Sequence, residues 1–230
     1  MYLKEIIAKL LNFIFPIYCV ACGKENTYAC ESCFKKIDFT GYISDFSHFG
    51  RMNGEKKYFD EVIAAGRYKE DSILAKLIHL FKYDSAKEIG ILFAVPLQNL
   101  TIKNADYFRN AVFVPVPLHF RRRNRRGFNQ SEILAKELSN LTKIPMQNLL
   151  TRKRYTRPQV ELSHNERIKN LIDAFALENA DEKLDTKTVY CLIDDVCTTG
   201  STINECAKVL KKNGAERVIG LVVAQATQAK

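Results

Sequence analysis

Residues 189–202 read VYCLIDDVCTTGST, and this stretch constrains the fold more than any other part of the chain. The apolar run 189–193 predicts a buried strand, and two adjacent carboxylates, Asp194 and Asp195, follow it directly. A loop of small and hydroxylated residues then leads into a helical pattern: Thr198, Thr199, Gly200, Ser201 and Thr202. A helix start offers free backbone N–H groups and the positive end of the helix dipole to an anion. Because ligands bind at the carboxyl ends of strands in open α/β sheets, the stretch predicts a nucleotide-type binding site.

The same stretch resembles the PRPP-binding motif of the type I phosphoribosyltransferases in its strand, its two aspartates and its TTGST loop. The resemblance implies that Asp194 and Asp195 hold the ribose 2′ and 3′ hydroxyls and that residues 198–202 enclose the 5′-phosphate. It also implies a Mg²⁺ ion that bridges the ribose oxygens and the pyrophosphate. Two acids after a strand also occur in Walker B motifs and in receiver domains. A P-loop ATPase would need the pattern G-x-x-x-x-G-K-[ST], which the chain lacks.

Four of the seven cysteines form two C-x-x-C pairs near the N-terminus, Cys19 with Cys22 and Cys30 with Cys33. Each pair can present two thiolates on one tight turn, and Gly23 relieves backbone strain in the first turn. Four sulfurs in a tetrahedron are the ligand set of a closed, structural Zn²⁺ site. A disulfide framework would need a secreted context, and a redox C-x-x-C motif would explain only one pair. The other cysteines are expected to be small buried residues: Cys191, Cys197 and Cys206.

A strongly basic segment follows a predicted strand at 111–116, because five of the six residues 121–126 are arginine. Their mutual repulsion disfavours close packing without an anion, and the planar guanidinium group suits phosphate. A charge run is usually a solvated surface loop, and that alternative stays open. If strand 111–116 lies beside strand 189–193, the basic loop faces residues 198–202 across the crevice of the sheet.

Strands alternate with helices along most of the chain, which predicts an α/β fold with a doubly wound, mostly parallel sheet. We expect an amphipathic helix and zinc ribbon at 1–38, a connector at 39–58 and a phosphoribosyltransferase-like domain at 59–230. The expected strands are 62–68, 111–116, 189–193 and 217–224, with two short ones within 150–176. The expected helices are 73–80, 88–100, 131–141 and 202–213, the third with a capping box of Asn129 and Glu132.

The N-terminal residues 3–14 carry apolar side chains at helical spacing. We interpret them as a helix docked on its own protein, with membrane-surface or partner contact as the alternative. Lys4, Glu5 and Lys9 argue against a signal peptide. The sequence contains no run of about 18 apolar residues, so we expect no membrane span. We therefore expect a cytoplasmic protein. Its net charge of +9 suits polyanionic partners such as nucleic acid.

Segments on both sides of the arginines, PVPLH and RGFNQ, and a later stretch that begins RYTRPQ, resemble the ComF (ComFC) family of competence proteins. The layout is also similar, with a zinc ribbon before a phosphoribosyltransferase-like domain. The resemblance implies that Arg122 and Arg126 are recurring arginines, that Lys82 is a recurring lysine and that residues 154–170 form a mobile hood loop. Pyrophosphate or DNA phosphate is then the expected ligand of four cations: Lys82, Arg122, Arg126 and Arg154.

The chain departs from related patterns in three places. The ribbon of this family is often described as double, whereas four cysteines make only one Cys₄ site. Glutamine-using phosphoribosyltransferases begin with a catalytic cysteine, whereas this chain has Tyr2, which argues against a purine-synthesis amidotransferase. Purine salvage enzymes close an aromatic hood after the last strand, but few residues follow the last expected strand here.

Two hypotheses follow from these motifs. In the first, the chain is a ComF-type protein associated with DNA uptake, with a PRPP–Mg²⁺ site and a basic loop that binds single-stranded DNA; its zinc ribbon could dock a competence helicase. In the second, it is an active phosphoribosyltransferase that transfers the pentosyl group of PRPP to an unknown acceptor. Lys82, Arg122 and Arg126 would then stabilise the leaving pyrophosphate. His119 is a candidate base only by proximity, so catalytic turnover stays open.

Overall fold

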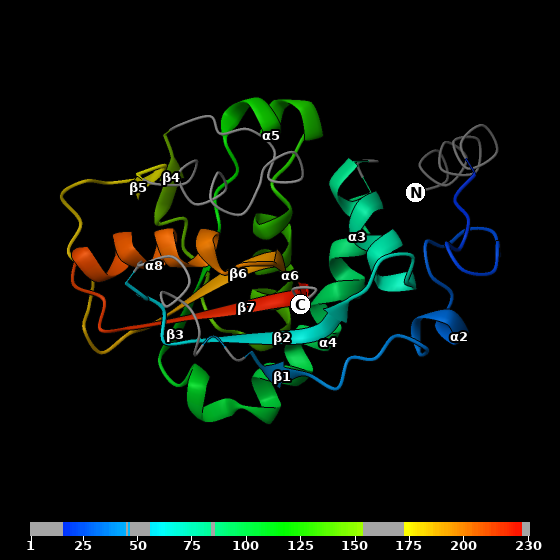
Figure 1. Cartoon of the computed structure of the whole chain (residues 1–230), viewed down its shortest axis with the longest axis horizontal. Coiled ribbons are helices and arrows are strands. Elements are labelled where there is room, and N and C mark those ends of the chain that lie inside the picture. The colour runs from blue at the N-terminus through cyan, green and yellow to red at the C-terminus, as the bar shows by residue number, and fades with distance from the viewer. Residues whose placement is uncertain (1–15, 45, 47–55, 84–85, 154–172, 227–230) are drawn as a thin grey trace, which may run out of the picture.

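A five-stranded sheet forms the centre of the structure, a computed structural model that describes residues 16–44, 46, 56–83, 86–153 and 173–226. Its strands are β1 (Tyr42–Ile43), β2 (Glu61–Tyr68), β3 (Ala111–Pro115), β6 (Val189–Cys197) and β7 (Arg217–Ala226). They lie in the order β1-β2-β7-β6-β3. All neighbours pair in parallel except β1, which is antiparallel to β2 (Figure 1). The predicted mostly parallel α/β sheet is therefore confirmed.

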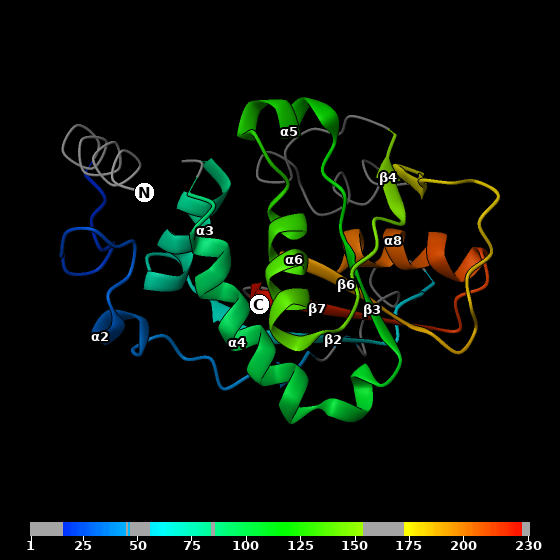
Figure 2. The ribbon, with the colours of Figure 1, turned by 180° about the vertical axis from the view of Figure 1, so that it is seen from behind.

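Helices cover both faces of this sheet, which is the doubly wound arrangement expected from the sequence (Figures 1 and 2). Three helices pack on one face: α3 (Ile73–Tyr83), α4 (Ile89–Lys103) and α6 (Gln130–Thr142). Helix α8 (Ser201–Lys212) packs on the other face, together with a small antiparallel sheet of β4 (Leu150–Arg152) and β5 (Phe175–Leu177). The shorter helices are α2 (Glu31–Phe34), the 3₁₀ helix η1 (Ala105–Phe108) and α5 (Phe120–Arg126).

Side chains of β6 alternate between two hydrophobic cores. Cys191 and Ile193 belong to the core shared with α3, α4 and α6, whereas Tyr190 and Leu192 belong to the core shared with α8. A strand buried on both faces reads as a continuous apolar run, which explains the sequence pattern before the two aspartates. Leu192 is fully buried, so we expect Leu192→Ala to destabilise the fold by about 2–5 kcal/mol.

Strand β6 is longer than the sequence predicted. Its pairing with β3 ends at Ile193, whereas its pairing with β7 continues to Cys197. Asp194 and Asp195 therefore lie within β6, on the part that extends past β3, and the prediction that the strand ends at residue 193 was wrong. The backbone of this extension still finds partners in β7, which is why the strand continues beyond the apolar run.

The arginine-rich segment predicted as a loop is instead the short helix α5. At its start, Nδ1 of His119 accepts a hydrogen bond from the backbone N–H of Arg121 at 3.2 Å. At its end, Gly127 adopts φ 78°, and its N–H donates to the carbonyl of Arg123. Both ends are thus capped, and no residue of α5 is buried. Because α5 is exposed, its arginines keep their hydration and the helix forms without burying charge. The two caps satisfy backbone groups at its ends.

The N-terminal unit packs beside α3. Ala29 is buried in the same core as α3, and Tyr28 and Phe34 pack against that core. Strand β1 lies in the stretch 39–58 that we expected to be a connector, so this stretch contributes an edge strand to the sheet. The predicted helix at 3–14 and the candidate Arg154 lie outside the described residues. Among the described helices, none combines the length and the apolar character needed to cross a membrane.

Candidate functional site

An ion pair joins the end of α3 to the extension of β6. Nζ of Lys82 lies 2.9 Å from Oδ1 of Asp195, and the side chains are 24% and 8% exposed. Lys82 is in the last turn of α3, which packs on the face of the sheet that Asp195 also reaches. The sequence predicted both residues as parts of one site, and the structure brings them together. A buried carboxylate is stable here because a cation neutralises it.

Asp194 is held by two donors. Its Oδ1 accepts one hydrogen bond from Oγ of Ser131, at the start of α6, and another from the backbone N–H of Asp195, both at 2.9 Å. Burial and the adjacent charge of Asp195 raise the pKa of Asp194 to about 7, although Lys82 and Ser131 oppose the shift. The acid pair therefore holds more negative charge than its surroundings neutralise easily, and such a pair favours hydroxyl donors or a cation.

Gln130 connects the two cationic elements of the site. This first residue of α6 is 2% exposed. Its Nε2 donates to the carbonyls of Phe81 and Lys82, at 3.1 and 3.3 Å. Its Oε1 accepts from Nη1 of Arg126 at 3.1 Å. One buried amide thus ties α5 to the end of α3. The sequence analysis did not single out Gln130, although it belongs to the RGFNQ segment quoted there.

The loop between β6 and α8 is closed by its own hydroxyl groups. Oγ1 of Thr199 and Oγ of Ser201 lie 2.9 Å apart, and the N–H of Ser201 points to Oγ1 of Thr199 at 3.4 Å. Gly200 adopts φ 80° and immediately precedes α8. Buried Asn204, in the first turn of α8, ties this helix to a distant segment, because its Oδ1 accepts from the N–H of Tyr58 at 2.7 Å. The predicted arrangement of strand, acid pair, small loop and helix start is present.

The two arginines predicted for the site have partly buried positions on α5. Arg126 is bound to Gln130, and its guanidinium lies 5.0 Å from the ring centroid of Tyr83 at the end of α3. Arg122 is close enough to the guanidinium of Arg152 to lower its pKa. Both residues therefore lie on the side of α5 that faces the rest of the molecule.

Arg152 is a candidate site residue that the sequence analysis missed. It lies on β4, with its guanidinium 5.0 Å from the ring centroid of Phe175 on β5. Burial and the charge of Arg122 lower its pKa to about 10, while Cys206 and Asp194 act in the opposite direction. Arg152 thus shares the electrostatic environment of the acid pair. Its only sequence signal was its position just before the RYTRPQ stretch.

His119, the candidate base, has a structural role in this site. It is 3% exposed, and its Nδ1 already accepts the hydrogen bond that begins α5. Burial lowers its pKa, and the charges of Arg152, Arg121 and Arg122 lower it further. The ring therefore serves as a helix cap.

The four N-terminal cysteines converge as predicted. Their sulfur atoms all lie within 4.8 Å of one another. Sγ of Cys30 lies 3.9 Å from that of Cys19 and 3.6 Å from that of Cys22. Four sulfurs bound tetrahedrally at about 2.3 Å from an ion are about 3.8 Å apart, so the observed spacing fits a metal. Gly23, at φ 74°, follows the first knuckle, and Cys33 lies on α2 in the second.

The remaining cysteines are buried, as expected. Cys191, Cys197 and Cys206 are at most 4% exposed. Burial raises the pKa of Cys197 to about 12, with a further contribution from Asp194. Thiols in this state do not act as nucleophiles near neutral pH.

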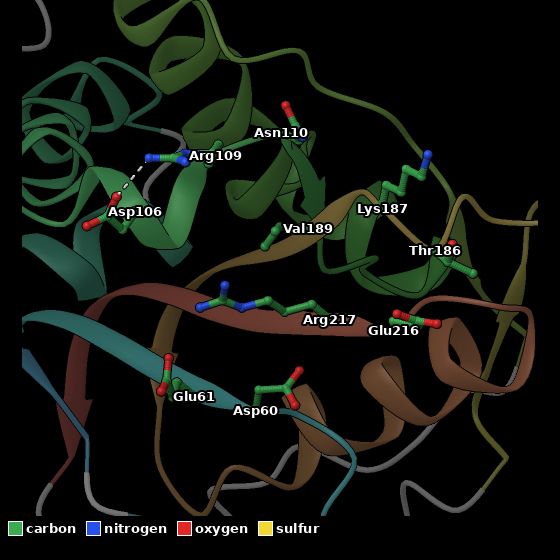
Figure 3. A pocket seen from close by; sticks show the side chains of 10 residues that line it. All are labelled: Asp60, Glu61, Asp106, Arg109, Asn110, Thr186, Lys187, Val189, Glu216 and Arg217. Carbon is green, nitrogen blue, oxygen red and sulfur yellow. Dashed lines mark hydrogen bonds and ion pairs between the residues drawn. The ribbon is translucent and has the colours of Figure 1, made fainter.

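A cavity of about 640 Å³ lies at the opposite edge of the sheet, where the parallel strands begin (Figure 3). Glu61 and Arg217 line it from the first residues of β2 and β7, and Val189 from the first residue of β6. Its lining mixes acids and bases, and Arg109 pairs with Asp106 across 3.2 Å. This cavity is remote from the acid pair and has no convergent chemistry, so the candidate site is placed at the carboxyl edge.

Comparisons with known proteins show which proteins this chain is similar to. Residues 124–230 match the family described as Phosphoribosyl transferase domain. The chain is 32% identical to Competence protein F of Haemophilus influenzae over 209 residues, which cover 89% of this chain and 82% of that protein. It is 38% identical to DNA utilization protein YhgH of Escherichia coli K12, over 63% of this chain and 64% of that protein. It is 25% identical to Competence protein ComFC of Bacillus subtilis, over 64% and 57%.

The phosphoribosyltransferase-type match includes β6, the loop after it and α8. The fold is accordingly a phosphoribosyltransferase-like α/β sheet, preceded by a four-cysteine unit. Lys82 and the cysteine cluster lie before the matched residues, so this match does not include the contact between Lys82 and the acid pair.

Proposed function

Because the chain belongs to the competence protein F family, we propose that it binds PRPP with Mg²⁺ at the Asp194–Asp195 site and single-stranded DNA through α5. The relatives are named for competence and for DNA utilization. Those names favour a role in handling DNA. The same site has an acid pair that suits ribose hydroxyls and a small loop at a helix start that suits a phosphate.

One observation carries the PRPP part of the proposal. Asp194 and Asp195 lie on the part of β6 that extends past β3, and only Val196 and Cys197 separate them from the loop that leads into α8. In the proposed complex the carboxylates accept hydrogen bonds from the ribose hydroxyls. The hydroxyl and N–H groups of residues 198–202 hold the 5′-phosphate at the start of α8. Sugar and phosphate are thus bound by adjacent residues of one local unit.

Magnesium fits this donor set. The partly buried Asp194 and buried Asp195 offer carboxylate oxygens, which are the ligands that Mg²⁺ prefers in proteins, together with phosphate oxygens. Bound with PRPP, the ion would neutralise negative charge on the diphosphate. Lys82, Arg122, Arg126 and Arg152 would hold the remaining phosphate oxygens.

We further propose that Cys19, Cys22, Cys30 and Cys33 hold one structural Zn²⁺. The sulfur spacing fits tetrahedral coordination, and four thiolates leave no open position for a substrate. The ion would stabilise the short chain between two knuckles, which has little apolar core of its own.

The second candidate function is pentosyl transfer from PRPP to an acceptor. The cluster of Lys82, Arg122, Arg126 and Arg152 favours it, because such cations would stabilise pyrophosphate as it leaves C1′. The buried, capping His119 does not supply a general base. The acceptor would therefore have to be a nucleophile that needs no deprotonation by this residue.

The decisive experiment titrates one preparation with PRPP–Mg²⁺ and, separately, with single-stranded DNA. Wild type should bind both. Asp194→Asn with Asp195→Asn should lose PRPP binding, because an amide is a weaker acceptor and a poor Mg²⁺ ligand. Asp106→Asn, an exposed acid beside the remote cavity, is the matched control and should bind PRPP like wild type.

Unchanged PRPP affinity in the double variant would refute the site. Steady pyrophosphate release by wild type, once a nucleobase or amine is supplied, would favour the transferase function instead.

A further inference from the structure

Helix α5 has two faces with different surroundings. At about 3.6 residues per turn, Arg122 and Arg126 share one face, and Arg121 and Arg125 share another. The first two are partly buried, whereas Arg121 and Arg125 are exposed. Phe120 is also exposed, at 60%. In both views α5 lies at the margin of the molecule (Figures 1 and 2).

The inner face is held against the small-ligand site. Arg126 is fixed by Gln130, which also binds the carbonyl of Lys82. The charge of Arg122 lowers the pKa of Arg152, and the charge of Asp194 raises it. These contacts place the inner arginines with the acid pair, so they fit a compact phosphorylated ligand better than a long polymer.

The outer face combines a ring with cations. The guanidinium of Arg121 lies 5.9 Å from the ring centroid of Phe120, and His119 packs on that ring at 4.4 Å. A large apolar ring so exposed contributes little to folding. Aromatic rings among basic side chains are the usual platform for unpaired bases, because the ring stacks on a base while the cations contact the backbone.

We propose that the outer face of α5, formed by Phe120, Arg121 and Arg125, binds single-stranded DNA, with Phe120 stacking on a base. Arg121 and Arg125 contact the flanking phosphates. The inner arginines Arg122 and Arg126 serve the PRPP site instead. This inference rests on the proposed DNA-binding function and assigns it to a defined surface, which leaves the two ligands on different faces of one helix.

The test measures affinity for a labelled oligothymidylate in wild type and in Phe120→Ala. Stacking is worth about 1–3 kcal/mol per base, so the variant should bind about 5- to 150-fold more weakly. Phe120→Trp retains a ring and should bind at least as well as wild type. On an oligonucleotide of the same length with abasic sites, wild type and Phe120→Ala should bind equally, because no base remains to stack.

A crossed pair of double variants separates the two faces. Arg121→Ala with Arg125→Ala should reduce the slope of log affinity against log salt by about 0.7 per lost phosphate contact. The same pair should leave PRPP–Mg²⁺ affinity unchanged. Arg122→Ala with Arg126→Ala should weaken PRPP binding and leave the effect of Phe120→Ala on DNA intact.

The outcomes distinguish the stacking surface from the more general proposal that the protein binds single-stranded DNA. Wild type that binds no single-stranded DNA overturns both. If wild type and Phe120→Ala bind single-stranded DNA with equal affinity, the stacking surface alone is overturned. The same holds if Phe120→Ala loses as much affinity on the abasic oligonucleotide as on the oligothymidylate. A helical circular dichroism signal and an unfolding midpoint like those of wild type show that Phe120→Ala remains folded.

Discussion

Lys82 Nζ lies 2.9 Å from Oδ1 of Asp195, and this contact joins the C-terminal turn of α3 to the extension of β6 at the carboxyl edge of the sheet. The two residues are far apart in the sequence, so their contact depends on the packing of α3 on the sheet. Together with Ser131, which binds Asp194, the pair makes two adjacent carboxylates tolerable at a partly closed position. Four predictions follow from this arrangement, from the contacts around it and from the N-terminal cysteine cluster.

Lys82→Met should destabilise the fold, because it leaves the buried carboxylate of Asp195 without its cation. We expect a loss of about 1–3 kcal/mol near neutral pH, since Lys82 is partly exposed and water screens part of the effect. Urea unfolding measures it. Lys76→Met, at an exposed position of the same helix, should change the unfolding free energy by less than about 0.5 kcal/mol. Equal losses in both variants would show that the ion pair is unimportant.

Gln130→Ala should also destabilise the fold and should loosen α5. The change removes the acceptor of Arg126 and leaves the carbonyls of Phe81 and Lys82 without this donor. We expect a loss of about 1–3 kcal/mol in unfolding free energy. Hydrogen exchange should speed up in the amides of α5 and of the last turn of α3. Gln147→Ala, at an exposed position, is the control and should leave both unchanged.

Asp194 should make the unfolding free energy depend on pH. Its folded pKa is about 7, above the ordinary value of 3.8, so between these values the folded state binds more protons than the unfolded state. Its contribution is therefore fully present below about pH 4 and is lost as pH rises through 7. Relative to Asp194→Asn, wild type should become less stable across this window in urea titrations. A constant difference between the two proteins from pH 4 to 8 would contradict the raised pKa.

The Cys₄ cluster should carry one zinc ion per chain in protein purified without chelators. Cys30→Ser removes a central sulfur and should release the metal and unfold the N-terminal unit, since binding and folding are coupled in such small sites. Ser32→Ala lies beside Cys30 and should keep the metal. Elemental analysis measures both, and metal-free wild type would refute the site.

Some of the site could be read directly from the sequence, because its parts are local. The two C-x-x-C pairs, and the acids followed by TTGST, are spaced so that short turns alone bring them together. The alternation of strands and helices predicted the parallel sheet for the same reason. The cap of α6 was also visible, since Asn129 accepts from Ser131, only two residues away.

Other features depend on contacts between distant segments. The length of β6 follows from β7, which pairs with it after β3 has ended. Arg152 and Gln130 acquire their roles only when β4 and α6 meet the acid pair and the end of α3. We predicted the arginine segment as a loop because the repulsion between its like charges could be inferred from the sequence. The two caps that stabilise it as a helix could not be recognised there.

The sequence by itself thus determined the chemistry available to this protein: four thiolates, two carboxylates, a small hydroxylated loop and a run of arginines. The tertiary structure decided which arginines face the acid pair and which face solvent, and that Lys82 neutralises Asp195. The physical reason is that charge pairing and burial depend on distances through space. Packing of helices on the sheet sets those distances, and local spacing along the chain does not.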